Sequence, residues 1–318
     1  MSMSGENKTG TTITTTPRCA SCGVTEGDGI KLKNCAACHL VQYCGAKCQR
    51  EHRSKHKLEC KERAAKLRDE LLFTQPQSSC FGDCPICFLP LSLDIKKSVI
   101  MQCCGKVICY GCRHACRAIE EKMARKEKCP FCREQTAESQ EEVDKQLKER
   151  AAKNDPVALH EAGIMFVQRR DYQNALKNWL KAIELGDVAS QHELGHMYIN
   201  GYGVKRDEAK AKYLYEQAAI GGHPYARHRL GIIEGEYGEY GRAIKHFMIA
   251  SKLGLDDSLA MLKRFYSAGL VSKEDFTAAL RGHQAAVDAT KSPQREAAEP
   301  IRQNNLRQKQ LVRMFGAP

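Results

Sequence analysis

The sequence of 318 residues predicts two small metal-stabilised α+β fingers followed by an all-α solenoid of helix-pair repeats. Three observations support this fold class. All 17 cysteines lie between Cys19 and Cys132, where they form two clusters of closely spaced pairs. After Asn154 the chain contains no cysteine. In that part, similar segments recur at intervals of about 32 to 36 residues, as in stacked helical repeats.

Composition narrows the class of protein. No segment approaches the roughly 18 consecutive apolar residues of a membrane span, so we expect no membrane contact. Residues 1–17 are rich in Thr and lack the apolar stretch of a signal peptide, which predicts a disordered N-terminus and an intracellular protein of the cytoplasm or nucleus. In such a reducing compartment, cysteine clusters indicate metal binding rather than disulfides.

The first predicted finger spans residues 18–60. It contains eight soft ligands in four close pairs, which is what two tetrahedral structural zinc ions require. These ligands are Cys19, Cys22, Cys35, Cys38, Cys44, Cys48, His56 and Cys60. In the last two pairs the ligands are four residues apart, so each pair is expected on one face of a helix. The spacing therefore predicts a zinc-stabilised finger.

The segment from Tyr43 to Cys60 resembles the MYND-type zinc finger. The resemblance implies one zinc held by Cys19, Cys22, Cys44 and Cys48, and a second held by Cys35, Cys38, His56 and Cys60. His52 is an alternative to His56, although only His56 falls on the family position. Arg53 stands where the family usually has Trp. Fingers of this family bind short proline-containing peptides, which are therefore expected partners.

A short charged helix (61–73) and a Gln/Pro/Ser linker (74–79) are predicted within residues 61–82, before a second finger at 83–134. The second cluster opens with Cys84-Pro-Ile-Cys87, closes with Cys129-Pro-Phe-Cys132, and resembles a RING finger. In that family two zinc ions are held crosswise by alternating ligand pairs. The resemblance implies one zinc on Cys84, Cys87, Cys109 and Cys112, and a second on Cys103, Cys104, Cys129 and Cys132. The chain would then hold about four Zn²⁺ ions.

The second cluster departs from the family pattern at one ligand. Where the family has a histidine this sequence has Lys106, so we expect an all-cysteine variant that uses the adjacent residues Cys103 and Cys104. Neighbouring cysteines strain a shared tetrahedral site, and His114 and Cys116 therefore stay open as substitute ligands. Cys80 is expected to be a free thiol.

The RING resemblance also implies an activity, that of a ubiquitin ligase without a covalent intermediate of its own. Such a finger holds a ubiquitin-conjugating enzyme whose thioester is attacked by a client lysine. By resemblance, Ile86 and Pro130 would contact the conjugating enzyme, and Arg133 would bridge that enzyme and ubiquitin. An exposed apolar residue on a rigid metal-held loop forms a small binding hot spot, and a guanidinium can bind two carbonyl groups. We expect no catalytic residue in the chain itself.

A charged helical connector at 135–153 leads to the repeats at 154–290. The segments beginning at Asp155, Asp187 and His223 align, and each reaches a glycine nine residues into the alignment. With the loop Gly201-Tyr-Gly-Val, this register resembles Sel-one-like repeats, relatives of tetratricopeptide repeats. The resemblance implies a concave surface that binds client proteins. Residues 291–318 are expected to form a disordered basic tail.

A metallopeptidase signature, His192-Glu193-Leu-Gly-His196, lies inside this repeat, with Glu216 as a conceivable third ligand. The repeat itself accounts for most of the signature, because His160-Glu161 and His228-Arg229 occupy the same register. Gly195 is expected where helices pack closely, which is a poor place for an open zinc site. We therefore favour a structural role for this motif.

The net charge does not change this interpretation. Fifteen zinc-bound thiolates and four Zn²⁺ ions would lower the formal charge of +12 by seven, to about +5, which gives little support for a nucleic-acid partner. The sequence therefore predicts a zinc-binding protein-interaction scaffold that acts as a RING-type ubiquitin ligase. The alternative is a non-catalytic adaptor whose fingers only bind peptides.

Overall fold

A computed structural model describes residues 17–27 and 29–315, with side chains to residue 308. The chain divides into two compact units, Met1–Leu72 and Phe73–Pro318. The predicted disordered N-terminus lies outside the described residues, apart from Pro17. Each unit contains one of the two cysteine clusters, and the second unit also contains the helical repeats.

The first unit is a small finger attached to a long helix. Strand β1 (Lys33–Asn34) pairs antiparallel with β2 (Gln42–Tyr43), and α1 (Ala46–Leu72) follows. The sequence predicted a separate charged helix after Cys60. Instead α1 continues through that point, because no glycine or proline between Ala46 and Leu72 interrupts the backbone hydrogen bonds.

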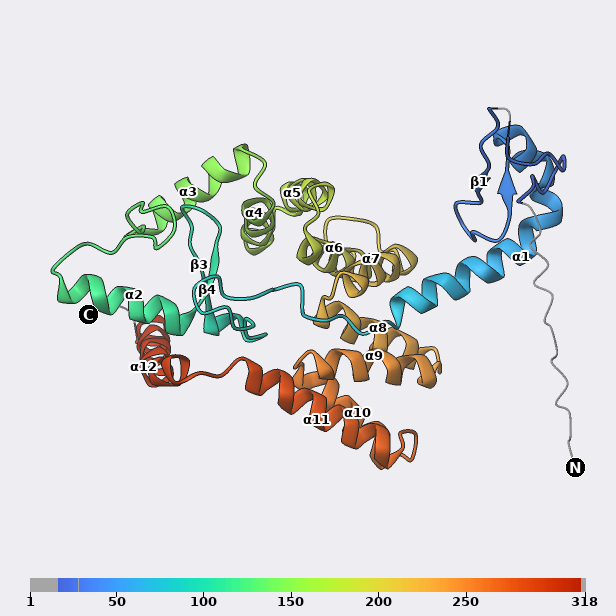
Figure 1. The fold of residues 1–318 in the computed structure, drawn as a ribbon. Coiled ribbons are helices and arrows are strands. Elements are labelled where there is room, and N and C mark those ends of the chain that lie inside the picture. The colour runs from blue at the N-terminus through green and yellow to red at the C-terminus, as the bar shows by residue number, and fades with distance from the viewer. Residues whose placement is uncertain (1–16, 28, 316–318) are drawn as a thin grey trace, which may run out of the picture. The chain divides into compact units, whose positions relative to one another are not determined.

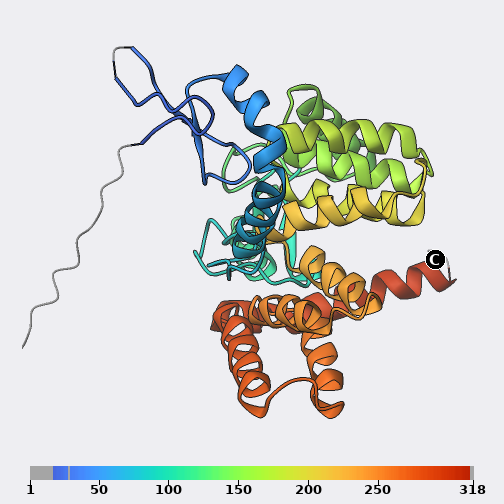
Figure 2. The same ribbon diagram turned by 90° about the vertical axis from the view of Figure 1, so that its right-hand side faces the viewer.

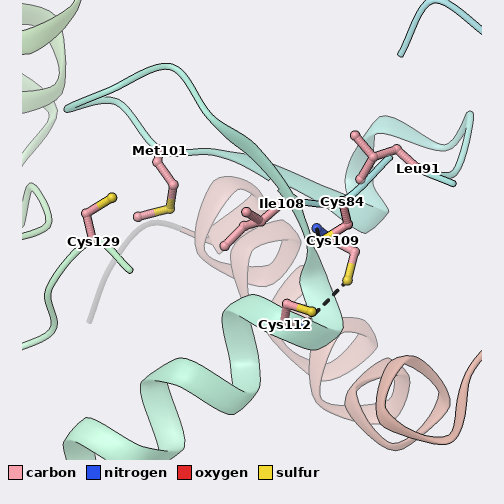
Figure 3. Close-up of a cluster of buried hydrophobic side chains, with 7 residues drawn as sticks. All are labelled: Cys84, Leu91, Met101, Ile108, Cys109, Cys112 and Cys129. Atoms are coloured by element: carbon pink, nitrogen blue, oxygen red, sulfur yellow. Dashed lines mark hydrogen bonds between the residues drawn. The ribbon is translucent and has the colours of Figure 1, made fainter. Parts of the chain in front are cut away.

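The second finger opens the second unit. A single-turn helix, η1 (Ile95–Lys97), precedes strand β3 (Ser98–Ile100), which pairs antiparallel with β4 (Val107–Cys109), and α2 (Tyr110–Lys122) follows directly. Leu91, Met101 and Ile108 are buried here beside four cysteines (Figure 3). The apolar core is therefore small, and four of its seven buried members are potential metal ligands.

A helical array forms the rest of the second unit (Figures 1 and 2). Its elements are α3 (Gln140–Ala152), α4 (Pro156–Gln168), α5 (Tyr172–Glu184), α6 (Val188–Asn200), α7 (Glu208–Ile220), α8 (Pro224–Glu236), α9 (Tyr240–Lys252), α10 (Asp256–Ser267), α11 (Lys273–Ala289) and α12 (Pro293–Phe315). Helices α4 to α9 pack in consecutive pairs, with α4 on α5, α6 on α7 and α8 on α9. The predicted fold class is therefore confirmed.

Glycines set the close packing within each pair. A Cβ atom on Gly163 would lie 2.2 Å from Trp179, one on Gly195 2.8 Å from Tyr215, and one on Gly231 2.7 Å from Phe247. The first helix of each pair thus offers a flat site to an aromatic ring of the second. Alanines complete the contact where the helices cross, and Ala182, Ala218, Ala219 and Ala250 are fully buried. This explains the recurring glycine of the sequence repeat.

The C-terminal segment differs from its prediction. Residues 293–315 form helix α12, where a disordered basic tail was expected. Ser292 accepts a hydrogen bond from the backbone N–H of Arg295, and Pro293 occupies the first helical position. Helix α12 packs against α2 of the second finger, burying Ala298 and Arg302 (Figure 1). Tertiary packing therefore orders a segment that has few large apolar residues.

Among the described helices, no helix combines the length and the apolar character that crossing a bilayer requires.

Candidate metal centres

The sixteen predicted ligands gather into four groups of four. In each group the ligand atoms all lie within 4.8 Å of one another. The first unit contains the groups Cys19, Cys22, Cys44, Cys48 and Cys35, Cys38, His56, Cys60; the second contains Cys84, Cys87, Cys109, Cys112 and Cys103, Cys104, Cys129, Cys132. Within the described residues these are the groups that could hold a metal ion. Their membership agrees with the grouping that both resemblances implied.

The spacing of the sulfur atoms fits zinc. Four sulfurs at about 2.3 Å from one tetrahedral ion lie about 3.8 Å from each other. Observed Sγ–Sγ distances include 3.7 Å for Cys22 and Cys44, and 3.9 Å for Cys87 and Cys109. In the fourth group Cys132 and Cys103 are 3.3 Å apart. The thiols are therefore arranged around common centres, as tetrahedral coordination requires.

Four of the five Cys-x-x-Cys pairs share one backbone turn, and the fifth, Cys109 and Cys112, lies at the start of α2. The residue after the second cysteine has a positive φ angle and donates its backbone N–H to the carbonyl oxygen of the first cysteine. These residues are Gly23, His39, Phe88 and Arg133, with N–O distances of 2.9, 2.9, 2.8 and 3.1 Å. Three of the four carry side chains in a conformation that costs about 1 kcal/mol or more. The turn holds both thiols on the same side of the loop.

Helix α1 completes the first finger. Cys44 precedes the helix and Cys48 lies in its first turn, while His56 and Cys60 lie one turn apart further along. The buried His56 Nε2 lies 3.1 Å from Cys38 Sγ and so faces the second centre. His52, the alternative ligand, instead has its Nδ1 3.1 Å from the hydroxyl of Tyr43. The helix therefore presents His56 and not His52 to the thiols.

Electrostatics show why these groups need a cation. In the second centre, burial and the neighbouring thiols of Cys38 and Cys35 together raise the pKa of Cys60 to about 12. Burial also raises the pKa of Cys35, but backbone hydrogen bonds from Cys38 and Ala37 outweigh it and lower the pKa to about 6. Thiolates this close repel each other, so the three thiols of this centre can be deprotonated together only around a metal ion.

The fourth group uses the adjacent cysteines Cys103 and Cys104. They lie on the tight turn between β3 and β4, where Gly105 has a φ angle of 73° and donates its N–H to the carbonyl of Met101 at 2.7 Å. The two substitutes considered, His114 and Cys116, lie on α2 and do not join the group. Cys80 is also outside every group, and burial beside Asp187 raises its pKa to about 12.

The three residues implied to contact a conjugating enzyme lie on, or directly after, the first and last Cys-x-x-Cys loops of the second finger. Ile86 and Pro130 are half-buried, and Ile86 packs on the finger core. Arg133 is exposed and follows the last ligand. Large apolar side chains are exposed at the same loops, on α2 and directly after it, and they include Phe88 (77 % exposed), Phe131, Ile119 and Met123. Sequence reasoning did not single out these four residues.

The peptidase signature is part of the helical packing. His192 Nδ1 lies 3.0 Å from Glu193 Oε1, and the His192 ring stacks on His223 with centroids 4.6 Å apart. Gly195 packs against Tyr215. His192, Glu193 and His196 do not belong to any of the metal-competent groups in the described part of the chain. Glu216 is buried and takes no part in those groups either.

Family comparisons agree with this geometry in two regions. Residues 19–60 match the MYND finger, and residues 158–187 and 188–223 match the Sel1 repeat. The chain thus contains a zinc-binding MYND finger and Sel1 repeats, two modules that mediate protein–protein interactions. The second cysteine cluster lies between the matched regions.

Individual relatives cover only parts of the chain. Over 101 residues, 30 % of this chain, it is 34 % identical to the ERAD-associated E3 ubiquitin-protein ligase component HRD3B of Arabidopsis thaliana. The match covers 16 % of that relative, so the chain corresponds to a small part of its length. Two solved structures are similar at 19 % identity. They are a Sel1 repeat protein from Oxalobacter formigenes (TM-score 0.41; 60 % of this chain, 86 % of that one) and the protective antigen c5321 of uropathogenic Escherichia coli (0.40; 56 % and 46 %).

Proposed function

We propose that this zinc-finger and Sel1-repeat scaffold acts as a RING-type ubiquitin ligase. In this proposal the second finger holds a ubiquitin-conjugating enzyme, and the helical array holds a client protein. The first finger adds a second binding site, for proline-containing peptides. We propose cytosol or nucleus as the location, because groups of free thiols persist in a reducing compartment.

One observation carries the proposal: the interleaved grouping of the second cluster. The first and third ligand pairs share one centre, and the second and fourth pairs share the other. This crosswise arrangement was implied by the RING resemblance. The chemistry of the donors fits zinc, with four thiols at each centre. Zinc would supply rigidity there, and the sixteen ligands would hold about four ions in the whole chain.

The proposed contact surface has suitable properties for a transient partner. Phe88 and Phe131 are exposed at the first and last Cys-x-x-Cys loops of the second finger, close in sequence to Ile86 and Pro130. Loops fixed by metal ligands lose little conformational entropy on binding, so a small apolar surface can reach useful affinity. The backbone N–H of Arg133 closes the last Cys-x-x-Cys turn, while its side chain is exposed. A guanidinium held in this way can bridge carbonyl groups on two partners.

No residue of this chain performs a covalent step in the proposed reaction. A client lysine attacks the thioester of the conjugating enzyme, and the finger restricts the orientations of that thioester. A client held by the array in the same unit raises the effective concentration of the attacking amine. Partial similarity to a ligase component is consistent with this assignment. The rival assignment is a non-catalytic adaptor, in which the MYND finger and the repeats bind proteins and the second finger is only structural.

In vitro autoubiquitination with a panel of conjugating enzymes tests the proposal. We expect chain formation by the wild-type protein and at least about a tenfold loss in Ile86→Ala and Arg133→Ala, in keeping with the loss of hot-spot contacts. The matched controls are Ile95→Ala, an exposed isoleucine of η1, and Arg125→Ala, an exposed arginine after α2. Both controls should keep full activity, and all four variants should keep their zinc content. Wild-type activity no higher than that of Ile86→Ala would favour the adaptor.

A further inference from the structure

Two arginines of the helical array reach the metal loops of the second finger. Arg150 lies in the last turn of α3, and Arg295 lies in the first turn of α12. Each approaches a different metal centre, and neither was singled out by the sequence. They are separated from the loops that they contact by 48 and more than 200 residues.

Arg295 holds the loop of the third centre. Its Nη1 donates to the carbonyl oxygens of Pro90 (2.7 Å) and Thr290 (2.8 Å). Its Nη2 donates to the carbonyl oxygen of Leu89 (3.0 Å) and to Sγ of the ligand Cys87 (3.2 Å). One guanidinium therefore binds a ligand sulfur and the two residues that leave this Cys-x-x-Cys turn.

Helix α12 can approach this closely only because position 111 is a glycine. A Cβ atom on Gly111 would lie 2.8 Å from Cα of Arg295. Gln294 donates to the carbonyl oxygen of Gly111 at 3.4 Å, and Asn305 to the hydroxyl of Tyr110 at 3.0 Å. The first turn of α12 is thus fixed against the start of α2, beside the ligands Cys109 and Cys112.

Arg150 holds the turn of the fourth centre in the same way. Its side chain is 9 % exposed, and its Nη1 donates to the carbonyl oxygen of Gln102 at 3.0 Å, directly before Cys103. Its Nε and Nη2 both donate to Oδ2 of Asp155, at 3.0 and 2.9 Å. Asp155 also caps α4 through its other oxygen. A Cβ atom on Gly105 would lie 2.0 Å from Nη2 of Arg150, so the turn fits closely around the guanidinium.

These contacts lie at centres that keep a net negative charge when a zinc ion is bound. Four thiolates around one Zn²⁺ carry a net charge of −2, and the adjacent carbonyl oxygens add partial negative charge. A guanidinium at the rim balances this charge, and its fixed fork of donors restrains the loop that holds the ligands. Two adjacent ligands strain a shared tetrahedral site, so the pair Cys103 and Cys104 in particular needs such restraint.

We propose that Arg150 and Arg295 are positioning residues for the two metal centres of the second finger, so that zinc retention there is coupled to docking of α3 and α12. The proposal depends on zinc binding by this finger and not on ligase activity. Coupling of this kind is reciprocal, since a bound ion favours the docked helices as much as the docked helices favour the ion.

Zinc release from the full-length protein tests the proposal. The zinc-loaded protein is mixed with an excess of the chromophoric chelator 4-(2-pyridylazo)resorcinol, and the rate and amplitude of each phase are recorded. For Arg150→Met and Arg295→Met, we expect one or two ions per chain to leave about tenfold faster, while the remaining ions leave at the wild-type rate. Arg281→Met, which changes an exposed arginine of α11, should release zinc like the wild type.

Two outcomes would overturn the proposal. One is an unchanged release profile in both variants, and the other is faster release of all four ions, which would indicate general destabilisation. Unfolding of the helical array is followed through Trp179, the single tryptophan, which is buried in α5. A variant isolated with fewer zinc ions but with an unchanged Trp179 transition supports the proposal as well.

Three further measurements separate positioning from simple structural loss. Arg295→Lys keeps the charge but not the fork, so its release rate should lie between those of wild type and Arg295→Met. Gly111→Ala should accelerate release although both arginines remain. In the reciprocal experiment, chelation of wild-type zinc should increase hydrogen exchange of residues 293–308. Unchanged exchange in that segment would contradict the coupling.

Discussion

The second finger and the helical array lie in the same unit but have very different interiors. The buried cluster of the finger contains Leu91, Met101 and Ile108 among four cysteines. A cluster in the array contains Trp179, Leu194, Met197 and Leu214 around Ala175 and extends over neighbouring helices. Burial of a few apolar side chains cannot offset the conformational entropy of some fifty residues. From this comparison we expect metal coordination to set the stability of the fingers, whereas side-chain packing sets that of the array.

Removal of the metal should produce the largest difference in stability between the fingers and the helical array. Structural zinc in small fingers contributes apparent binding energies of about 10 kcal/mol or more per ion. We therefore expect a strong chelator to abolish hydrogen-exchange protection in 19–60 and 84–132, while α4 to α11 remain protected. Mass spectrometry of the untreated native protein should show about four zinc ions per chain.

The control for this experiment is Cys80→Ser, which changes a cysteine outside all four groups. That variant should retain every ion, whereas Cys129→Ser should lose at least one. Protection that survives chelation in 84–132 would show that the finger core is sufficient on its own, and the contrast between the two regions would fail.

A change in side-chain packing should have the opposite effect: it should destabilise the helical array and leave the fingers unchanged. In Gly231→Ala the new methyl group meets the buried ring of Phe247, 2.7 Å from the ideal Cβ position. Overpacking of this kind costs about 1 to 3 kcal/mol. We expect the midpoint of urea unfolding, followed by Trp179 fluorescence, to fall accordingly, with the number of bound zinc ions unchanged.

Gly241→Ala is the matched control, because it lies in the first turn of α9, and a methyl group there meets no atom within 4 Å. Alanine is the better helix former, so this variant should be as stable as wild type or more stable by up to about 1 kcal/mol. Equal loss in both variants would mean that backbone effects, and not the glycine–aromatic contact, determine the stability of the pair.

Local signals allowed the repeats and the ligand groups to be predicted. Ligand spacing is a local property of the chain, so the pairs around Cys19, Cys35, Cys84 and Cys129 could be identified directly. The division of pairs between centres came from resemblance to known fingers, because spacing alone allows several pairings. The glycines at 163, 195 and 231 marked the repeat, and their contacts with aromatic rings explain its regularity.

Long-range contacts could not be predicted in the same way. Arg295 is a single polar residue in a segment with few large apolar side chains, and no periodicity connects it to Cys87. The one local signal was Ser292 followed by Pro293, a favourable helix start. It indicates that a helix begins there but not that the helix packs against the second finger. The charged helix predicted at 61–73 is in fact the second part of α1. A change from ligand-bearing to charged sequence does not by itself end a helix.

The smallest effect expected is a pH dependence confined to the array. His246 is fully buried, and neither of its ring nitrogens has a hydrogen-bond partner among the described residues. The centre of its ring lies 4.8 Å from that of Phe73. Burial, together with the charges of Arg227, Arg242 and Lys212, lowers its pKa to about 3. The folded array therefore holds this histidine neutral, while the unfolded chain protonates it near pH 6.5.

The sign follows from linkage. The contribution of neutral His246 to the free energy of unfolding is fully present above pH 6.5. It decreases as the pH falls towards 3, because only the unfolded state then binds the proton. The loss is at most about 1.4 kcal/mol per pH unit for this residue. Urea unfolding of the chelator-treated protein at pH 7.0 and 5.5, followed by Trp179 fluorescence, excludes any contribution from zinc release. His246→Leu should reduce the difference between the two pH values by up to about 1.4 kcal/mol, and an equal difference in variant and wild type would show that protonation of another group controls the acid sensitivity of the array.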